Sequence, residues 1–173
     1  AFCSSGIQIS FLIVTLNDIS ERKKIEVSLT ERESLFSGLY DNMTSGSAIY
    51  EVINDGSNGS DYIIKNFNKK SLEIEGKTID QVVGKSLFDL RPTIDEYGLI
   101  PVMKKVWETG EAAYFPIKIY QDDVFSNYYE NNIFRLPSGE VITIYNDVTD
   151  VKNAEKKIKK SESKFKSIFL HAN

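Results

Sequence analysis

The segment that decides the fold is LPSGEVITIYNDVTDVK, which runs from Leu136 to Lys152. It begins with a turn at 137–140, continues with β-branched and aromatic residues over 141–146, and becomes charged and helix-favouring from Asp147. Thr149 is placed to cap this helix, because its hydroxyl can accept hydrogen bonds from the amide groups of the first turn. The segment therefore predicts a strand that leads directly into a helix.

A similar junction occurs near the start of the chain. Phe11–Leu16 (FLIVTL) predicts a short apolar strand, and Asp18 then opens a helical pattern. When Asp18 is aligned with Asp147, the two segments match without gaps. The identical pairs are Lys23/Lys152, Glu26/Glu155, Glu33/Glu162, Ser34/Ser163 and Phe36/Phe165. This internal repeat, with a unit of about 130 residues, indicates domains in tandem.

The composition is that of a folded protein, since 41% of the 173 residues are hydrophobic and 12% are aromatic. This length accommodates one domain of about 100 to 110 residues with flanking helices. We therefore expect four parts along the chain. They are the last strand of a preceding domain (1–20), a linker helix (21–43), a complete domain (44–150), and an outgoing linker helix with the start of the next domain (151–173).

Charge and cysteine content exclude several classes of protein. The net charge of -4 provides no broad basic surface for nucleic acid. Cys3 is the single cysteine, so one chain forms neither a disulfide nor a cysteine-based metal site, which favours a reducing compartment. The most apolar segment, 7–16, is too short to span a bilayer and lacks the features of a signal peptide. We expect a cytoplasmic location, and a membrane anchor elsewhere in a larger parent protein stays open. The isolated Asp122-Asp123 pair is interpreted as turn residues, so no metal site is expected.

Between the linker helices, hydrophobic patterns and turn signals predict five strands and three helices. The NDGSNGS segment at 54–60 favours a hairpin loop, and 86–92 is interpreted as a connection without periodicity. Pro101 must lie near the start of the longest helix or mark a kink. The predicted elements are strands 47–53 and 61–67, helices 69–75, 78–83 and 94–108, and strands 113–121, 128–136 and 141–146. An antiparallel five-stranded sheet with the helices on one face satisfies this order, which is an α+β fold.

Four motifs follow one another in a recognisable order. They are FNKKSLEIEG (67–76), DQVVGKSLFDL (80–90), VWETGE (106–111) and the strand-to-helix segment quoted above. In this order they resemble the PAS, or sensory-box, domain family over about residues 40–150 and both linkers. Asp147-Val148-Thr149 and Asp18-Ile19-Ser20 resemble the Asp-Ile-Thr signature that ends PAS sheets.

The resemblance implies a sensory and dimerisation module in a tandem-PAS signal-transduction protein, commonly a sensor histidine kinase of a two-component system. The expected partners are a second copy of the chain, the adjacent PAS and output domains of the parent protein, and a small-molecule ligand, but no nucleic acid. Two alternatives stay open: a ligand-free relay and dimerisation domain, and a regulatory PAS domain of a diguanylate cyclase. No catalytic motif is present, so this segment is not expected to be an enzyme, although the parent protein could be a histidine kinase.

The linker helices each carry a narrow hydrophobic seam with steps of three and four residues. Such a seam predicts coiled-coil pairing with another helix rather than burial in a globular core. The incoming seam is Arg22, Ile25, Leu29, Arg32, Phe36, Leu39 and Met43, and the outgoing seam is Val151, Ala154, Ile158, Ser161, Phe165 and Ile168.

The resemblance also implies a cavity between the sheet and its helices, whose cofactor or metabolite is unknown. Flavin-cysteinyl photochemistry is argued against, because Leu87 stands three residues after Gly84 where that class has its cysteine. Ligation of haem by histidine is argued against because the single histidine, His171, lies in the outgoing linker.

Strand alternation separates residues 128, 130, 132 and 134 from residues 129, 131, 133 and 135, and similarity to ligand-binding PAS domains places the first set inward. The candidate pocket residues are Phe67, Phe88, Arg91, Trp107, Tyr128, Glu130, Asn132, Phe134, Thr143 and Tyr145. Arg91 could clamp a carboxylate or phosphate, or be an exposed or salt-bridged loop residue. Alternatively, the aromatic residues fill the core and leave no cavity. Asp147, Val148 and Thr149 are expected to pass a shift of the sheet to the outgoing helix.

Overall fold

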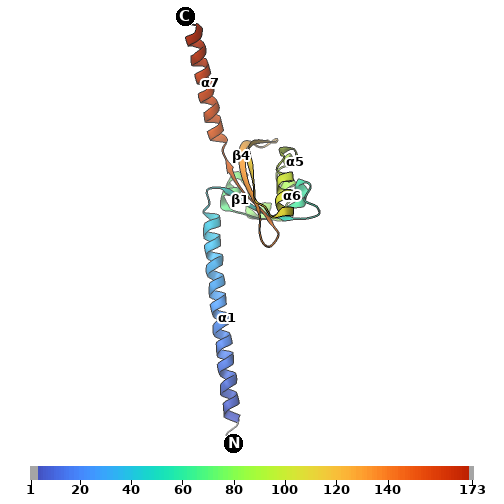
Figure 1. The fold of residues 1–173 in the computed structure, drawn as a ribbon, viewed down its shortest axis with the longest axis vertical. Coiled ribbons are helices and arrows are strands. Elements are labelled where there is room, and N and C mark those ends of the chain that lie inside the picture. The colour runs from blue at the N-terminus through green and yellow to red at the C-terminus, as the bar shows by residue number, and fades with distance from the viewer. Residues whose placement is uncertain (1–3, 172–173) are drawn as a thin grey trace. The chain divides into compact units, whose positions relative to one another are not determined.

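The computed structural model describes the backbone of residues 4–171 and the side chains of residue 19 and residues 21–167. The chain divides into two compact units, Ala1–Asn42 and Met43–Asn173. The first unit contains helix α1 (Ser4–Asp41), and the second contains a sheet, several short helices and helix α7 (Thr149–His171) (Figure 1). None of the described helices combines the length and the apolar character that crossing a membrane requires.

The second unit is built on a five-stranded antiparallel sheet in the order β2-β1-β5-β4-β3. Its strands are β1 (Gly46–Val52), β2 (Tyr62–Phe67), β3 (Ala113–Gln121), β4 (Ser126–Arg135) and β5 (Val141–Asp147). Strand β5, the last in the chain, pairs with both β1 and β4 and so occupies the centre of the sheet. The predicted sheet and the α+β class are confirmed.

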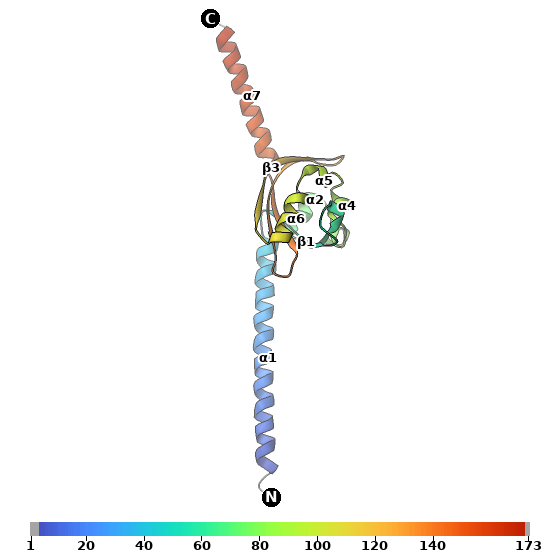
Figure 2. The ribbon, with the colours of Figure 1, turned by 45° about the vertical axis from the view of Figure 1, so that its right-hand side comes forward.

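Short helices between β2 and β3 cover one face of the sheet (Figure 2). They are α2 (Lys69–Glu75), α3 (Ile79–Val82), α4 (Leu87–Leu90), α5 (Ile94–Tyr97) and α6 (Ile100–Thr109), and a 3-10 turn, η1 (Gly59–Asp61), precedes β2. Helix α2 begins after Asn68, whose side chain accepts a hydrogen bond from the Ser71 amide, and it ends at Gly76 in the left-handed conformation with φ 62°. Both signals are local in the sequence, which is why the bounds of this helix could be predicted.

Two details of the helical layer differ from the prediction. The single helix expected over 94–108 is two helices, because Gly98 adopts φ 88° between α5 and α6. Pro101 then lies in the first turn of α6, where a proline is tolerated. The connection expected over 86–92 contains helix α4, which the side chains of Ser86 and Asp89 cap reciprocally.

The prediction of a strand over 11–16 is wrong, because these residues lie within helix α1, and so does the expected junction at 18–20. A strand needs a neighbour for its backbone N–H and C=O groups, whereas a helix pairs them internally. The described sheet provides no partner for this segment, since its strands all lie between Gly46 and Asp147. The assignment of residues 1–20 to a preceding domain stays a prediction.

The close approach of β1 to β5 provides a test of the packing. A Cβ atom on Gly46 would lie 2.6 Å from ring atoms of Tyr145, its partner on β5. We expect Gly46→Ala to lower the free energy of unfolding by about 1–3 kcal/mol in chemical denaturation, because the ring must move. Gly38→Ala is the control, since a Cβ there meets nothing within 4 Å. Equal stability of the two variants would contradict this packing.

Candidate functional site

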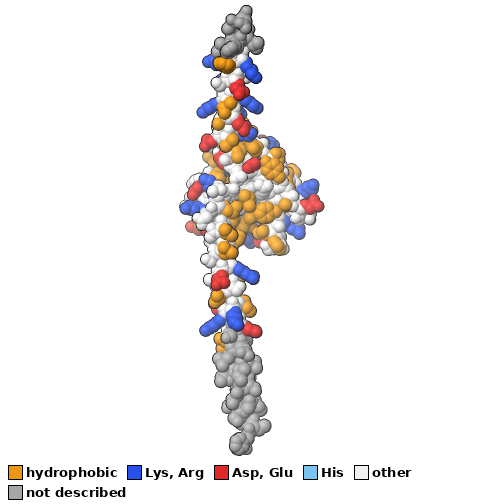
Figure 3. Space-filling view, turned by 60° about the vertical axis from the view of Figure 1, so that its left-hand side comes forward, with side chains coloured by type: hydrophobic (Ala, Val, Ile, Leu, Met, Phe, Trp, Pro, Cys, Tyr) orange, Lys and Arg blue, Asp and Glu red, His pale blue; other side chains and the backbone are white. Residues whose placement is uncertain are grey.

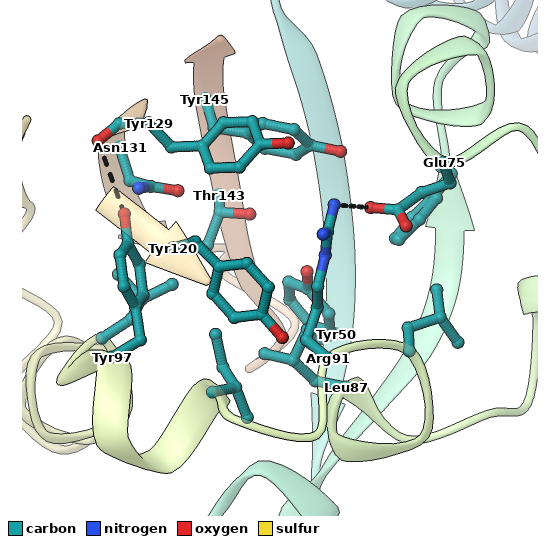
Figure 4. A pocket seen from close by; sticks show the side chains of 14 residues that line it. Tyr50, Glu75, Leu87, Arg91, Tyr97, Tyr120, Tyr129, Asn131, Thr143 and Tyr145 are labelled. Carbon is teal, nitrogen blue, oxygen red and sulfur yellow. Dashed lines mark hydrogen bonds and ion pairs between the residues drawn. The ribbon is translucent and has the colours of Figure 1, made fainter. Parts of the chain in front are cut away.

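A cavity of about 50 Å³ lies between the sheet and the helices (Figure 4). Ordinary ligand pockets have volumes of roughly 300–1,000 Å³, so this cavity has room for only a few atoms. Its wall combines aliphatic and aromatic side chains, five of them tyrosines, with four other residues that carry amide, hydroxyl or charged groups. The lining residues are Tyr50, Phe67, Glu75, Leu87, Leu90, Arg91, Ile94, Tyr97, Leu99, Tyr120, Tyr129, Asn131, Thr143 and Tyr145.

A buried ion pair forms one side of the cavity. Arg91, which ends helix α4, contacts Glu75, the last residue of α2, with 2.6 Å between Nη2 and Oε1. Their side chains are only 8% and 4% exposed. The guanidinium also lies over the ring of Phe125, 3.6 Å from its centroid, and 4.9 Å from that of Tyr120. Figure 4 shows Arg91 between the tyrosine rings on one side and Glu75 on the other.

Burial decides the protonation of these groups. It raises the pKa of Glu75, and the positive charge of Arg91 offsets only part of the rise. Burial acts to lower the pKa of Arg91, but the charge of Glu75 raises it above its ordinary value. Burial also raises the pKa of Tyr97 and of Tyr120 to about 12. At neutral pH the cavity therefore contains a positive guanidinium and neutral tyrosines.

Four buried polar atoms around the cavity have no hydrogen-bond partner among the described residues. They are Arg91 Nη1, Glu75 Oε2, the Tyr129 hydroxyl and Asn131 Nδ2. An unpaired buried polar group costs about 1–3 kcal/mol, so four of them in one place require an explanation. The cavity is thus small but rich in unused hydrogen-bonding capacity.

Four of the predicted pocket residues line this cavity, namely Phe67, Arg91, Thr143 and Tyr145. Phe88 does not, because its side chain is 40% exposed. Trp107 does not either, since it packs at the edge of the core. Whether the four residues bind a ligand stays a prediction.

The predicted orientation of β4 is wrong. Tyr129, Asn131 and Ile133 are the buried residues of this strand, so Tyr128, Glu130, Asn132 and Phe134 belong to the opposite face. Glu130 accepts hydrogen bonds there from Tyr114 and Asn146. A shift of one residue moves every side chain of a strand to the other face, and both faces of β4 carry tyrosine and asparagine. Ile133, the one aliphatic residue of this strand, was the available signal, and following it would have identified Tyr129 and Asn131.

The junction between β5 and α7 is fastened to β4. Asp147 Oδ1 accepts a hydrogen bond from the Thr149 amide at 2.9 Å, and Oδ2 accepts one from Asn127 Nδ2 at 2.7 Å. The Val148 amide donates to the Tyr128 carbonyl at 2.8 Å. The Thr149 hydroxyl accepts from the Tyr128 amide at 2.9 Å, so it bonds to the sheet rather than capping α7 as predicted. The start of α7 therefore follows the position of β4 as well as that of β5.

We expect Asp147→Ala to loosen this junction. It should lower the free energy of unfolding by about 1 kcal/mol and speed hydrogen exchange at the Thr149 amide, because two hydrogen bonds are lost. Burial acts to raise the pKa of Asp147, but the bonds from Thr149 and Asn127 lower it overall. Its stabilisation is therefore present above the unfolded-state pKa and lost as pH falls through the folded-state pKa, and the variant should lack this dependence.

The control for this junction is Asp150→Ala, which removes the same charge from the first turn of α7 and keeps the bonds of Asp147. Thr149 exchange should be unchanged in this control. Identical exchange rates in the two variants would show that Asp147 does not hold the junction.

We expect Arg91→Met to lower the free energy of unfolding by about 3–5 kcal/mol, because it leaves Glu75 buried without its partner. Adding Glu75→Leu should recover most of the loss in a double-mutant cycle. Lys65→Ala, which breaks the exposed pair with Glu51, is the control and should cost at most about 1 kcal/mol. Additive effects at 75 and 91 would contradict the coupling.

Comparisons with known proteins bear on the fold. No protein-family model matches the chain. The chain is 27% identical over 171 residues to sporulation kinase E of Bacillus subtilis (strain 168). The aligned region covers 96% of this chain but only 22% of that relative. The chain thus spans about a fifth of the length of the curated relative that it matches.

Two solved structures have similar folds. The PAS domain of an HTR-like protein from Haloarcula marismortui has a TM-score of 0.52 and 18% identity, covering 72% of this chain and 98% of its own. A domain of the sensory box sensor histidine kinase/response regulator from Geobacter sulfurreducens has a TM-score of 0.51 and 18% identity, covering 69% and 96% respectively. With its sheet order, its helices on one face and these similarities, the chain has the PAS fold.

Proposed function

We propose that this chain is a signal-sensing PAS module of a histidine kinase in a two-component system, and that it works as a dimer. The observation that carries the proposal is the course of strand β5. Thr143 and Tyr145 on this strand line the cavity, and the same strand continues through Asp147 into α7. One continuous segment therefore connects a candidate sensing site to an outgoing helix.

Strand β4 supplies a second connection. Tyr129 lines the cavity and packs edge-to-face on Tyr145, with 5.9 Å between the ring centroids. The preceding residue, Tyr128, bonds to the junction through both its carbonyl and its amide, and its hydroxyl accepts a hydrogen bond from Lys156 on α7 at 2.5 Å. A signal that favours one arrangement of these strands would thereby favour one arrangement of the helix.

Dimerisation is proposed from the exposed seams of the two linker helices, each taken by itself. On α7, Val151, Ile158 and Phe165 recur every seven residues and are 58%, 59% and 63% exposed. Figure 3 shows hydrophobic side chains recurring along this helix among charged ones. On α1, Ile25, Leu29, Phe36 and Leu39 are also exposed. A seven-residue apolar repeat is the pattern of a coiled coil, so a second copy of each helix is the proposed partner.

A ligand-free relay is the second candidate, and the small cavity volume of about 50 Å³ favours it. In that case the module transmits changes between neighbouring domains through its helices, and the core serves only packing. Both candidates require the linker helices to pair with those of a second copy, so a test of dimerisation is a test of both.

We expect Ile158→Glu to weaken the dimer of this 19.6 kDa chain at least about tenfold in native mass spectrometry and sedimentation, because it places charge in the seam. The matched control is Lys157→Glu, which introduces the same residue beside the seam. In the full-length parent protein, only Ile158→Glu should change the rate of autophosphorylation on histidine. A monomeric parent chain would overturn the proposed pairing, and a parent protein without histidine phosphorylation would overturn the proposed output.

A further inference from the structure

The unpartnered atoms around the cavity form a complementary set. Arg91 Nη1 and Asn131 Nδ2 can only donate hydrogen bonds, and the Tyr129 hydroxyl can also donate. Glu75 Oε2 is an acceptor when the carboxylate is charged. Each of these four side chains lines the cavity and is more than nine-tenths buried. A molecule that satisfies them needs one acceptor group and one donor group close together.

The charge of the site narrows the choice of molecule. Arg91 and Glu75 are joined through one oxygen and one nitrogen, although guanidinium and carboxylate can pair through two parallel bonds. Arg91 Nη1 and Glu75 Oε2 are therefore available to another partner. Because the pair is neutral overall, a bare anion or a bare cation would bring an unbalanced charge into a buried site. A ligand with both charges keeps the site neutral.

We propose that this cavity binds a small zwitterion of the α-amino acid class. The ligand's carboxylate accepts from Arg91, Asn131 and Tyr129, and its ammonium group donates to Glu75. The volume of about 50 Å³ restricts the ligand to the smallest members, such as glycine and alanine. This inference rests on the proposed sensory function and names the class of signal that the module would detect.

The test is calorimetric titration of the full chain with glycine and L-alanine, with acetate and methylammonium as probes that each lack one charged group. We expect glycine or alanine to bind at least about tenfold more tightly than either single-charge probe. Acetate binding as tight as glycine binding would overturn the zwitterion assignment. Absence of binding by both amino acids up to about 10 mM, an affinity weaker than about 3 kcal/mol, would overturn the site.

Two variants separate a binding role from a structural one. Glu75→Gln keeps the shape but removes the negative charge, so the ratio of glycine to acetate affinity should fall at least about tenfold. Tyr129→Phe removes an unpartnered hydroxyl, so it should weaken glycine binding without lowering the melting temperature. Tyr128→Phe is the matched control, because the neighbouring ring lies on the opposite face of β4, and it should leave glycine binding unchanged. Equal binding by both tyrosine variants would overturn the proposed contacts.

Native mass spectrometry of the same samples distinguishes the two proposals. A dimer that binds no amino acid leaves the proposed signalling module in place and removes only the ligand class. A monomer that binds glycine supports the proposed ligand class and overturns the proposed dimer.

Discussion

Strand β5 is hydrogen-bonded along both edges, to β1 on one side and to β4 on the other, and the other parts of the domain depend on this double pairing. The first strand of the domain meets the last one at the centre of the sheet, so the sheet is complete only when the whole segment from Gly46 to Asp147 is present. Tyr145 packs over Gly46 because no side chain stands between the two strands there. The same strand carries cavity residues in its middle and the junction at its end, so the cavity and the start of α7 lie on one continuous segment.

The Arg91–Glu75 pair places a different constraint on the helical face. Burying an ion pair rarely stabilises a protein relative to well-packed apolar residues, because both charges must leave water. Here a single contact, between Arg91 Nη2 and Glu75 Oε1, joins the pair, and polar atoms of Tyr129 and Asn131 nearby lack a hydrogen-bond partner in the described part of the chain. Selection for stability alone would not favour this arrangement. Its position joins the last residue of α2 to the residue that follows α4, so it also connects two helices that are separate in the sequence.

The sequence predicted features whose signals are local. The cap at Asn68, the stop at Gly76, the hairpins and the strand-to-helix segment after Leu136 each depend on residues close together in the chain. Features that depend on distant neighbours were missed. Alternation on β4 divides its residues into two sets, but only contact with the helices decides which set is buried. Glu75 and Arg91 are 16 residues apart and meet only through the fold. The N-terminal apolar segment has strand propensity, but the described strands pair only with one another, and residues 11–16 lie within helix α1.

The helices α3, α4 and α5 have four residues each. A helix of one turn has almost no internal hydrogen bonds and is held in place by its packing on other elements. Such segments open locally at much lower free energy than the sheet beneath them. Transient opening of this layer would therefore expose the side chains that line the cavity while all five strands stay paired. The rate of such an opening is set by a few residues of short helix and not by unfolding of the sheet.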